Sequence, residues 1–265
     1  MRLVSNELAF AYSPNREILE SVSLAVESSQ VAFILGANGT GKTTLLECLS
    51  GLRGPLRGSV TVDGQDIHQL APRVRARRIG LVPQLHEPVF EFTVEQAVLM
   101  GRAPHLGLFG RPSKRDHQAV HEAIDAVGAQ HLAKRPYTKI SGGERQLVLI
   151  ARGLAQGAQC LLMDEPVAHL DPHHQHDVLS IVRRLADDGF SFLITSHLPN
   201  HALLYADWVS FLLDGKTDIQ GSPLSTITER TLHLAYEMDF EIIESATGSR
   251  AVLPRVKRET RSASR

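Results

Sequence analysis

The chain has little cysteine, almost no excess charge and no long hydrophobic run. Its two cysteines, Cys48 and Cys160, lie in apolar surroundings without a CxxC pair, which argues against a disulfide framework and predicts buried thiols in a reducing compartment. The formal net charge of −1 gives no basis for broad attraction to nucleic acid or to an anionic bilayer. The longest apolar runs, at 31–35 and 147–151, are too short to span a membrane, and the opening MRLVSNELAF lacks the basic and apolar regions of a signal peptide. We therefore expect a soluble intracellular protein.

Strands and helices alternate in an order typical of α/β proteins. Alternation of apolar and polar residues over 2–26, around a YSPN turn, predicts two antiparallel strands, and VAFIL at 31–35 predicts a buried strand followed by a helix over about 41–50. The short apolar runs CLLMD and FSFLIT flank a helix, a β–α–β pattern that indicates a parallel sheet. Further strands are predicted in GSVTVDGQDI, in RIGLVPQ and in WVSFLLDGKTDIQ, the last as a hairpin that turns at Asp214–Gly215.

A block of mainly helical periodicity, over about 90–156, separates the first strands from the later ones. The segment GRAPHLGLFGRPS, at 101–113, interrupts its period. The block predicts a helical subdomain inserted in an α/β core, within one domain that extends over 1–245. Residues 246–265 become polar and end in VKRETRSASR, so we expect a flexible basic tail there.

The segment GANGTGKT, at 36–43, matches the phosphate-binding pattern GxxxxGK[ST]. A buried strand precedes it and a helix follows, so backbone N–H groups of the loop and of the helix N-terminus can surround the phosphates of a nucleotide. Lys42 would place a positive charge on the β- and γ-phosphates, and the hydroxyl of Thr43 or Thr44 would bind Mg²⁺. The candidate nucleotide-binding residues of the segment are Gly36, Asn38, Gly39, Gly41, Lys42, Thr43 and Thr44.

Polar side chains follow three other predicted strands. CLLMDEP contains Asp164, which would hold Mg²⁺ through water, and Glu165, which would orient or deprotonate an attacking water. Gln84 closes LVPQ and could bind Mg²⁺ or that water. His197 follows FSFLIT, at the edge of a parallel sheet where active sites form. Each signal is common by itself, and the phosphate loop is what favours a catalytic interpretation.

Two later stretches have an unusual composition. ISGGERQLVLIARGLA predicts an amphipathic helix that begins at Ser141, yet a helix start needs no pair of adjacent glycines. Gly142 and Gly143 therefore indicate that something approaches the backbone closely. HLDPHHQH, at 169–176, holds four histidines and raises the alternative of metal binding, but Asp171–Pro172 favours a helix start that places those histidines on different faces.

These motifs, and their order along the chain, resemble those of the ATP-binding subunit of ABC transporters. The resemblance covers nearly all of residues 1–240. It implies a P-loop NTPase core with a RecA-like mixed sheet, an N-terminal antiparallel β-subdomain and an inserted helical subdomain. It also implies a homodimer in which two ATP molecules, with Mg²⁺, lie between subunits arranged head to tail. Ser141, Gly142, Gly143 and Glu144 would then form a signature motif that contacts the nucleotide held by the opposite subunit.

The resemblance also implies roles for individual side chains. These are adenine stacking for Tyr12, phosphate and Mg²⁺ binding for Lys42 and Thr43, coupling to the membrane subunit for Gln84, general-base catalysis for Glu165, switching for His197 and contact with the partner subunit for Asp171. The implied metal ligands are Thr43, Gln84 and Asp164. Three positions depart from the family pattern: Glu144 stands where glutamine is commoner, PVAHLD follows Glu165 where small hydroxyl residues are usual, and Leu198 follows His197 where an acidic residue is frequent.

The segments ARRIGLVPQ, VLMGRAPH and RQLVLIARGLAQ are similar to those of ATPases that serve bacterial importers of iron–siderophore complexes, haem or vitamin B12. A sister branch carries molybdate or tungstate. This similarity implies an ATPase at the cytoplasmic face of the inner membrane, a separate permease that docks at 101–113, and a periplasmic or surface substrate-binding protein. The residues do not select among cargoes, because other subunits bind the substrate.

Two alternatives stay open. A soluble cassette acting on nucleic acid usually has two cassettes in one chain or a long coiled coil, whereas this chain has one cassette and no basic face, so we expect no nucleic-acid partner. A nucleotide-sensing regulator, the other alternative, would bind ATP tightly and hydrolyse it negligibly.

Overall fold

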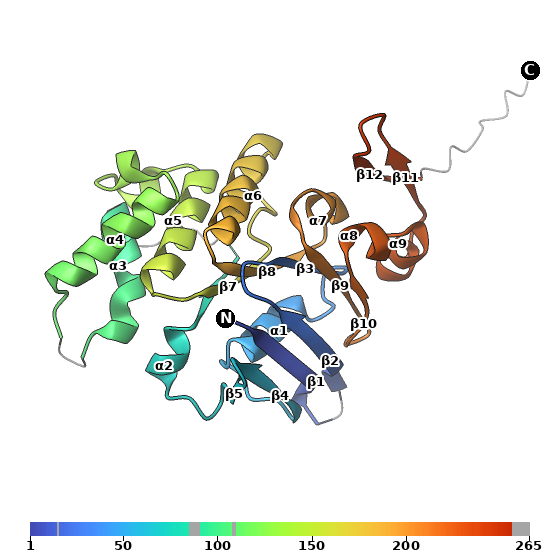
Figure 1. Ribbon diagram of the computed structural model, residues 1–265, viewed down its shortest axis with the longest axis horizontal. Helices are drawn as coiled ribbons and strands as arrows, with labels where there is room; N and C mark the ends of the chain where they lie inside the picture. The colour runs from blue at the N-terminus through green and yellow to red at the C-terminus, as the bar shows by residue number, and fades with distance from the viewer. Residues whose placement is uncertain (15, 85–90, 108–109, 256–265) are drawn as a thin grey trace, which may run out of the picture.

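A mixed sheet of ten strands runs through the protein in the order β5-β4-β1-β2-β10-β9-β3-β8-β7-β6 (Figure 1). The computed structural model describes residues 1–14, 16–84, 91–107 and 110–255. The strands of the sheet are β1 (Leu3–Ser13), β2 (Arg16–Val26), β3 (Val31–Leu35), β4 (Arg57–Val62), β5 (Gln65–Asp66), β6 (Ile79–Val82), β7 (Cys160–Asp164), β8 (Ser191–Ser196), β9 (Trp208–Leu213) and β10 (Lys216–Gly221). Parallel and antiparallel strands share this sheet and helices flank it, so the predicted α/β fold is confirmed.

The parallel half of the sheet brings the predicted site residues to one edge. Strands β3, β7 and β8 are buried along their whole length, which explains the runs of apolar residues in their sequences. Their register pairs Leu35 with Ser196 and Asp164 with Thr195, so the three strands end together. The phosphate loop, the two carboxylates and His197 therefore meet where these strands end.

The antiparallel half consists mainly of the N-terminal strands. β1 pairs with β2 in antiparallel orientation, as the alternating sequence of 2–26 predicts, and it also pairs with β4. This half is continuous with the parallel half, because Ser21 of β2 pairs with Lys216 of β10. The predicted hairpin between β9 and β10 is confirmed, with Asp214 and Gly215 at φ values of 45° and 73°.

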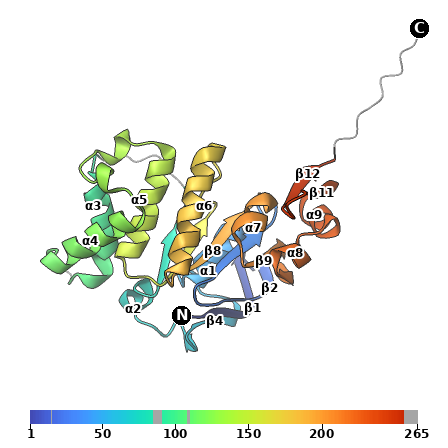
Figure 2. The ribbon, with the colours of Figure 1, turned by 45° about the horizontal axis from the view of Figure 1, so that its top comes forward.

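Helices cover the sheet, and a helical block built from α3, α4 and α5 lies at one end of it, beyond α6 (Figures 1 and 2). The α-helices are α1 (Lys42–Leu49), α2 (Pro72–Ala76), α3 (Val94–Leu99), α4 (Lys114–Ala126), α5 (Gly142–Ala155), α6 (Pro172–Asp187), α7 (Pro199–Tyr205), α8 (Pro223–Thr226) and α9 (Glu229–Tyr236). The 3₁₀ helices are η1 (Met100–His105), η2 (Gln130–Leu132) and η3 (Tyr137–Lys139), and η1 occupies part of the segment predicted to interrupt the helical period. Within the described part of the chain, every helix is too short or too polar to cross a membrane.

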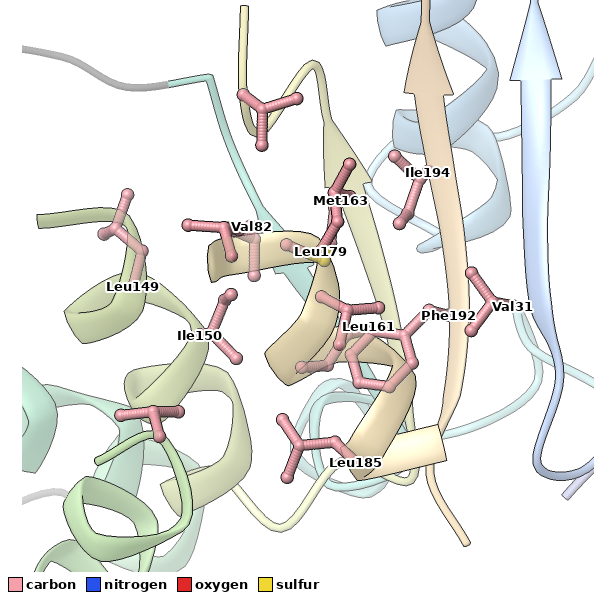
Figure 3. Packing of buried hydrophobic residues seen from close by; sticks show 14 of the residues in the cluster. Val31, Val82, Leu149, Ile150, Leu161, Met163, Leu179, Leu185, Phe192 and Ile194 are labelled. Atoms are coloured by element: carbon pink, nitrogen blue, oxygen red, sulfur yellow. The ribbon is translucent and has the colours of Figure 1, made fainter. Parts of the chain in front are cut away.

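Two apolar clusters, one on each face of the sheet, hold these layers together, and alternate residues of β3 belong to different clusters. In the larger cluster, Ile150 of α5 lies among residues of β6, β7 and α6 (Figure 3). The backbone of α5 packs closely on a β7 side chain here, since a Cβ added to Gly153 would lie 2.8 Å from Leu161 Cδ2. The other cluster buries Cys48 and Cys160, as predicted, and burial raises the pKa of each thiol to about 12.

The C-terminal residues form a small hairpin where the sequence predicts a flexible tail from residue 246. Strand β11 (Phe240–Glu244) pairs with β12 (Arg250–Pro254). Val252 explains the difference, because its side chain is buried and its backbone N–H and C=O bond to the side chain of Asn200 at 2.7 and 3.1 Å. The remainder of the predicted tail, 256–265, lies outside the described residues.

Candidate nucleotide-binding site

The phosphate-loop sequence forms the turn between β3 and α1. Gly39 and Gly41 have φ values of 83° and 98°, a left-handed conformation that glycine adopts without strain. Gly41 also packs closely, because an added Cβ would lie 2.8 Å from Ile18 Cγ2. These glycines therefore permit both the shape of the turn and its contact with β2.

The side chain of Lys42 is buried at this turn. Its Nζ donates hydrogen bonds to the carbonyl oxygens of Gly36 and Ala37, at 3.0 and 2.9 Å. It also forms an ion pair with Glu165 Oε1 at 3.2 Å, and the two side chains are only 5% and 15% exposed. The ammonium is thus fixed at the loop, where it can meet a charge-assisted hydrogen-bond acceptor such as a phosphate.

Asp164 and Thr43 form the second part of the site. Thr43 Oγ1 donates to Asp164 Oδ2 at 2.6 Å, and Thr195 Oγ1 donates to Asp164 Oδ1 at 2.7 Å. The Asp164 residue is only 7% exposed. Its carboxylate is therefore oriented by two hydroxyl groups, one from α1 and one from β8, as is usual for the support of a metal ligand.

Glu165 has a strained backbone. Its φ of 42° lies in the left-handed region that residues other than glycine rarely occupy. Its N–H donates to Thr195 Oγ1 at 3.0 Å. Its carboxylate lies between Lys42 and His197, whose Nδ1 is 3.1 Å from Glu165 Oε2. The structure thus brings together two residues that the sequence predicts to be catalytic.

A pocket of about 450 Å³ opens between these side chains. Its lining consists of Tyr12, Ile18, Asn38, Gly39, Gly41, Lys42, Thr43, Thr44, Gln84, Asp164 and Glu165. Gly36 lies outside the lining and packs against the backbone of Leu212. Thr43, Gln84 and Asp164 also line an adjoining pocket, and their hydroxyl, amide and carboxylate supply the oxygen donors that Mg²⁺ prefers. The residues present therefore fit the expected metal.

Tyr12 and Gln84 stand at the rim of this pocket. The Tyr12 residue is 59% exposed, and its Oη lies 3.1 Å from Thr44 Oγ1. Gln84 Nε2 lies 3.2 Å from His169 Nε2. An exposed aromatic ring in this position can stack on a base, which agrees with the role predicted for Tyr12.

The predicted signature segment lies outside the pocket. The Ser141 hydroxyl accepts a hydrogen bond from the Glu144 N–H at 3.2 Å, and the Glu144 carboxylate accepts one from the Ser141 N–H at 2.7 Å. The Ser141 N–H holds the pKa of Glu144 below its usual value. No hydrogen bond among the described residues uses the N–H of Gly142 or of Gly143. Two backbone donors are therefore free at the positive end of α5.

A contact within the same chain also explains why residue 143 is a glycine, Gly143. An added Cβ would collide with the ring of His174, so the start of α5 packs directly on the start of α6. Asp171 caps α6, because its carboxylate accepts from the His174 backbone N–H at 3.1 Å and lies 2.6 Å from His174 Nδ1. The backbone N–H of His174 keeps the pKa of Asp171 low. The interpretation that a nucleotide alone requires the glycines is therefore incomplete.

Thr195 is a site residue that the sequence analysis missed. One hydroxyl bonds to the Asp164 carboxylate and to the Glu165 N–H, so it fixes both acidic residues relative to β8. Its position beside Asp164 in the parallel register is the only signal, and that register is not visible in the sequence.

The segment between Glu165 and Asp171 is held from α6 and α7, which the sequence analysis also missed. Gln175 Nε2 donates to the Leu170 carbonyl at 3.0 Å, and its Oε1 lies 3.1 Å from His201 Nε2. Burial lowers the pKa of His201, because it disfavours the charged form of the ring. No local signal marks Gln175, because its contacts depend on how the two helices pack.

The four histidines of 169–176 have separate partners. The partners of His169, His173, His174 and His176 are Gln84, Asp177, Asp171 and Tyr205, respectively. In the part of the chain that the structure describes, no group of three His, Cys, Asp or Glu side chains could hold a metal ion.

Known proteins are similar to this chain over most of its length. The ABC transporter family model matches residues 19–168, more than half of the chain. A hemin import ATP-binding protein of Pseudomonas putida is 40% identical over 230 residues, which cover 85% of this chain and 89% of that protein. A cobalamin import ATP-binding protein of Halobacterium salinarum is also 40% identical, over 239 residues, and the match spans 89% of this chain but only 60% of that relative's length.

Solved structures give the same result. A chain of an ABC transporter described as being of the metal-chelate type, in an inward-facing conformation, matches with a TM-score of 0.84 and 30% identity, over 96% of this chain and 98% of that chain. Both the sequence and the fold therefore identify the same group of proteins. The chain belongs to the ABC transporter family, as an ATP-binding cassette.

Proposed function

We propose that this protein is the ATP-hydrolysing subunit of an ABC import system for a metal chelate of the iron–siderophore, haem or cobalamin type. The position of Glu165 carries the proposal, because its backbone is strained and its carboxylate lies between Lys42 and His197 at the phosphate loop. Phosphoryl transfer requires an oriented water and stabilisation of charge more than covalent chemistry. The hemin and cobalamin relatives, and the metal-chelate transporter, support the class of cargo.

Each side chain of the pocket would have a separate role in ATP hydrolysis. Lys42 would exchange its ion pair with Glu165 for contacts with the β- and γ-phosphates of ATP. Glu165 would then orient the attacking water and accept its proton, while His197 would donate a hydrogen bond to the charge that develops on the phosphate. The ligands of Mg²⁺, which neutralises phosphate charge when bound, would be Thr43, Gln84 and Asp164.

We further infer that each ATP is shared between two copies of the chain arranged head to tail. The support is the position of Gly142 and Gly143, whose free N–H groups lie outside the pocket of their own chain. They would bind the γ-phosphate held by the partner subunit, since a helix N-terminus favours anions. Asp171 lies on the same surface and would contact the partner subunit.

The membrane partner would be a separate permease at the cytoplasmic face of the inner membrane, supplied by a periplasmic or surface binding protein. A pocket of about 730 Å³ beside the predicted docking segment supports this, because Arg102, His105 and Ser113 line it. Arg102 is buried and held by Asp116 at 2.9 Å and by the Ala155 carbonyl at 2.7 Å. This concave surface, lined mainly by charged and polar side chains, would receive a short helix of the permease through polar contacts.

The substitution Glu165→Gln tests the hydrolytic function. We expect ATP hydrolysis to fall by at least about 100-fold, because the amide cannot accept a proton, while ATP binding persists. Glu27→Gln is the matched control, since Glu27 is an exposed carboxylate paired with Arg2 at 2.7 Å, and it should hydrolyse ATP at the wild-type rate. Wild-type hydrolysis by the Glu165→Gln variant would refute the proposed role.

In cells that contain the whole import system, the same variant should stop uptake of labelled haem, cobalamin or ferric siderophore. A loss of uptake confined to molybdate would favour the sister branch.

A further inference from the structure

Arg53, in the turn that follows α1, lies against the ring of Tyr12. Its Cζ is 4.7 Å from the centroid of the Tyr12 ring and 5.6 Å from that of Phe10. Phe10 and Tyr12 meet edge to face, with centroids 5.0 Å apart and an interplanar angle of 89°. A guanidinium at these distances makes a cation–π contact. One face of an otherwise exposed ring is therefore packed.

The guanidinium is itself anchored to α1. Arg53 Nε forms a salt bridge with Glu47, and the Arg53 backbone N–H donates to the Glu47 carbonyl at 3.2 Å. The same helix carries Lys42 and Thr43 at its start. A single helix thus positions the phosphate-binding residues at one end and Arg53 just beyond the other.

The Tyr12 ring also borders the nucleotide pocket. Tyr12 lines the pocket of about 450 Å³, whereas Arg53 is not among the described residues that line it. Tyr12 Oη is also fixed, 3.1 Å from Thr44 Oγ1. The ring is therefore held by its hydroxyl group and by the contact with Arg53, and it lines the pocket that a nucleotide would occupy.

We propose that Arg53 is a positioning residue for the base of the nucleotide, because it holds the Tyr12 ring in the orientation in which a purine stacks on it. This inference rests on the proposed function, since it takes ATP as the ligand of the pocket. A ring that is ordered before binding loses less conformational entropy when the base stacks. Arg53 lies outside the pocket, so its effect is confined to the base and does not extend to the phosphates.

Binding of ATP and of tripolyphosphate, which has the phosphates but no base, separates this role from a general effect. Both ligands are titrated calorimetrically into the full-length protein without Mg²⁺, so that no hydrolysis occurs. For Arg53→Ala we expect the ATP affinity to fall about two- to fivefold, the size of an exposed cation–π contact, and the tripolyphosphate affinity to stay at the wild-type value. Arg57→Ala is the matched control, because Arg57 is also an exposed, paired arginine, 2.7 Å from Glu17, and it should change neither affinity.

A double variant tests whether Arg53 acts through the ring. In a Tyr12→Leu background the substitution Arg53→Ala should have no further effect on ATP affinity, since the contact is already lost. An unchanged ATP affinity in Arg53→Ala would overturn the inference, and so would an equal loss for tripolyphosphate or a further loss in the Tyr12→Leu background. If the wild-type protein bound neither ligand, the proposed function would be refuted, and this inference would be refuted with it.

Discussion

The phosphate loop and the signature segment are both glycine-containing turns that open a helix, but their surroundings differ. At the phosphate loop, Lys42 bonds to two carbonyl oxygens and to Glu165 beside a pocket of the same chain. At the signature segment, the Ser141 and Glu144 side chains cap the helix, and the N–H groups of Gly142 and Gly143 have no partner among the described residues. The first turn is the wall of a pocket within the chain. We propose that the second is a surface that another molecule completes.

The substitution Gly143→Ala should disturb the second turn most strongly. The added methyl group would collide with the His174 ring, so we expect the free energy of unfolding to fall by about 1–3 kcal/mol. Chemical denaturation measures this change. Adding His174→Ala should recover part of the loss, because it makes room for the methyl group.

The matched control is Gly54→Ala, since a Cβ added at Gly54 meets no atom within 4 Å. The control should leave stability near the wild-type value. An equal loss of stability in Gly143→Ala and Gly54→Ala would show that the contact between α5 and α6 does not require a glycine.

A smaller effect is expected from the cap of α5. The Ser141 N–H lowers the pKa of Glu144, so the carboxylate stabilises the folded state above its unfolded pKa, and this contribution is lost as the pH falls through the lower folded pKa. Glu144→Gln should therefore melt at a slightly lower temperature than the wild type at neutral pH. The difference should begin to shrink as the pH falls below the ordinary glutamate pKa of about 4.3, and it should disappear below the lower folded pKa. Thermal melting of both proteins across this range measures it. A difference that does not vary with pH would contradict a role for the charge.

Structural features that depend on neighbouring residues in the chain could be predicted from the sequence. The turn before Lys42 follows from a strand, a glycine pattern and a helix, and Asp164 and Glu165 follow from a buried strand that ends in acidic residues. Their meeting with His197 could also be predicted, because parallel strands end at a common edge. The fold and most of the residues that line the pocket could therefore be predicted from the sequence.

Features that depend on packing between distant elements could not be predicted. The contact of Gly143 with His174 requires the crossing of α5 and α6, and the bonds of Thr195 require the register of β7 and β8. The order of β12 depends on the burial of Val252 and on the bond of its backbone N–H to Asn200 of α7. No local periodicity encodes such contacts, since each joins residues far apart in the chain.

The central claim is that a phosphate loop from one chain and a signature segment from another complete each ATP site. The most direct measurement is the amount of ATP retained by mixed dimers in a Glu165→Gln background, with Lys42→Ala in one chain and Ser141→Arg in the other. Neither variant alone should form a dimer that retains ATP, whereas the mixture should retain about one ATP per dimer, because one intact loop then meets one intact signature segment. A mixture that retains no more ATP than the two variants measured separately would contradict the account.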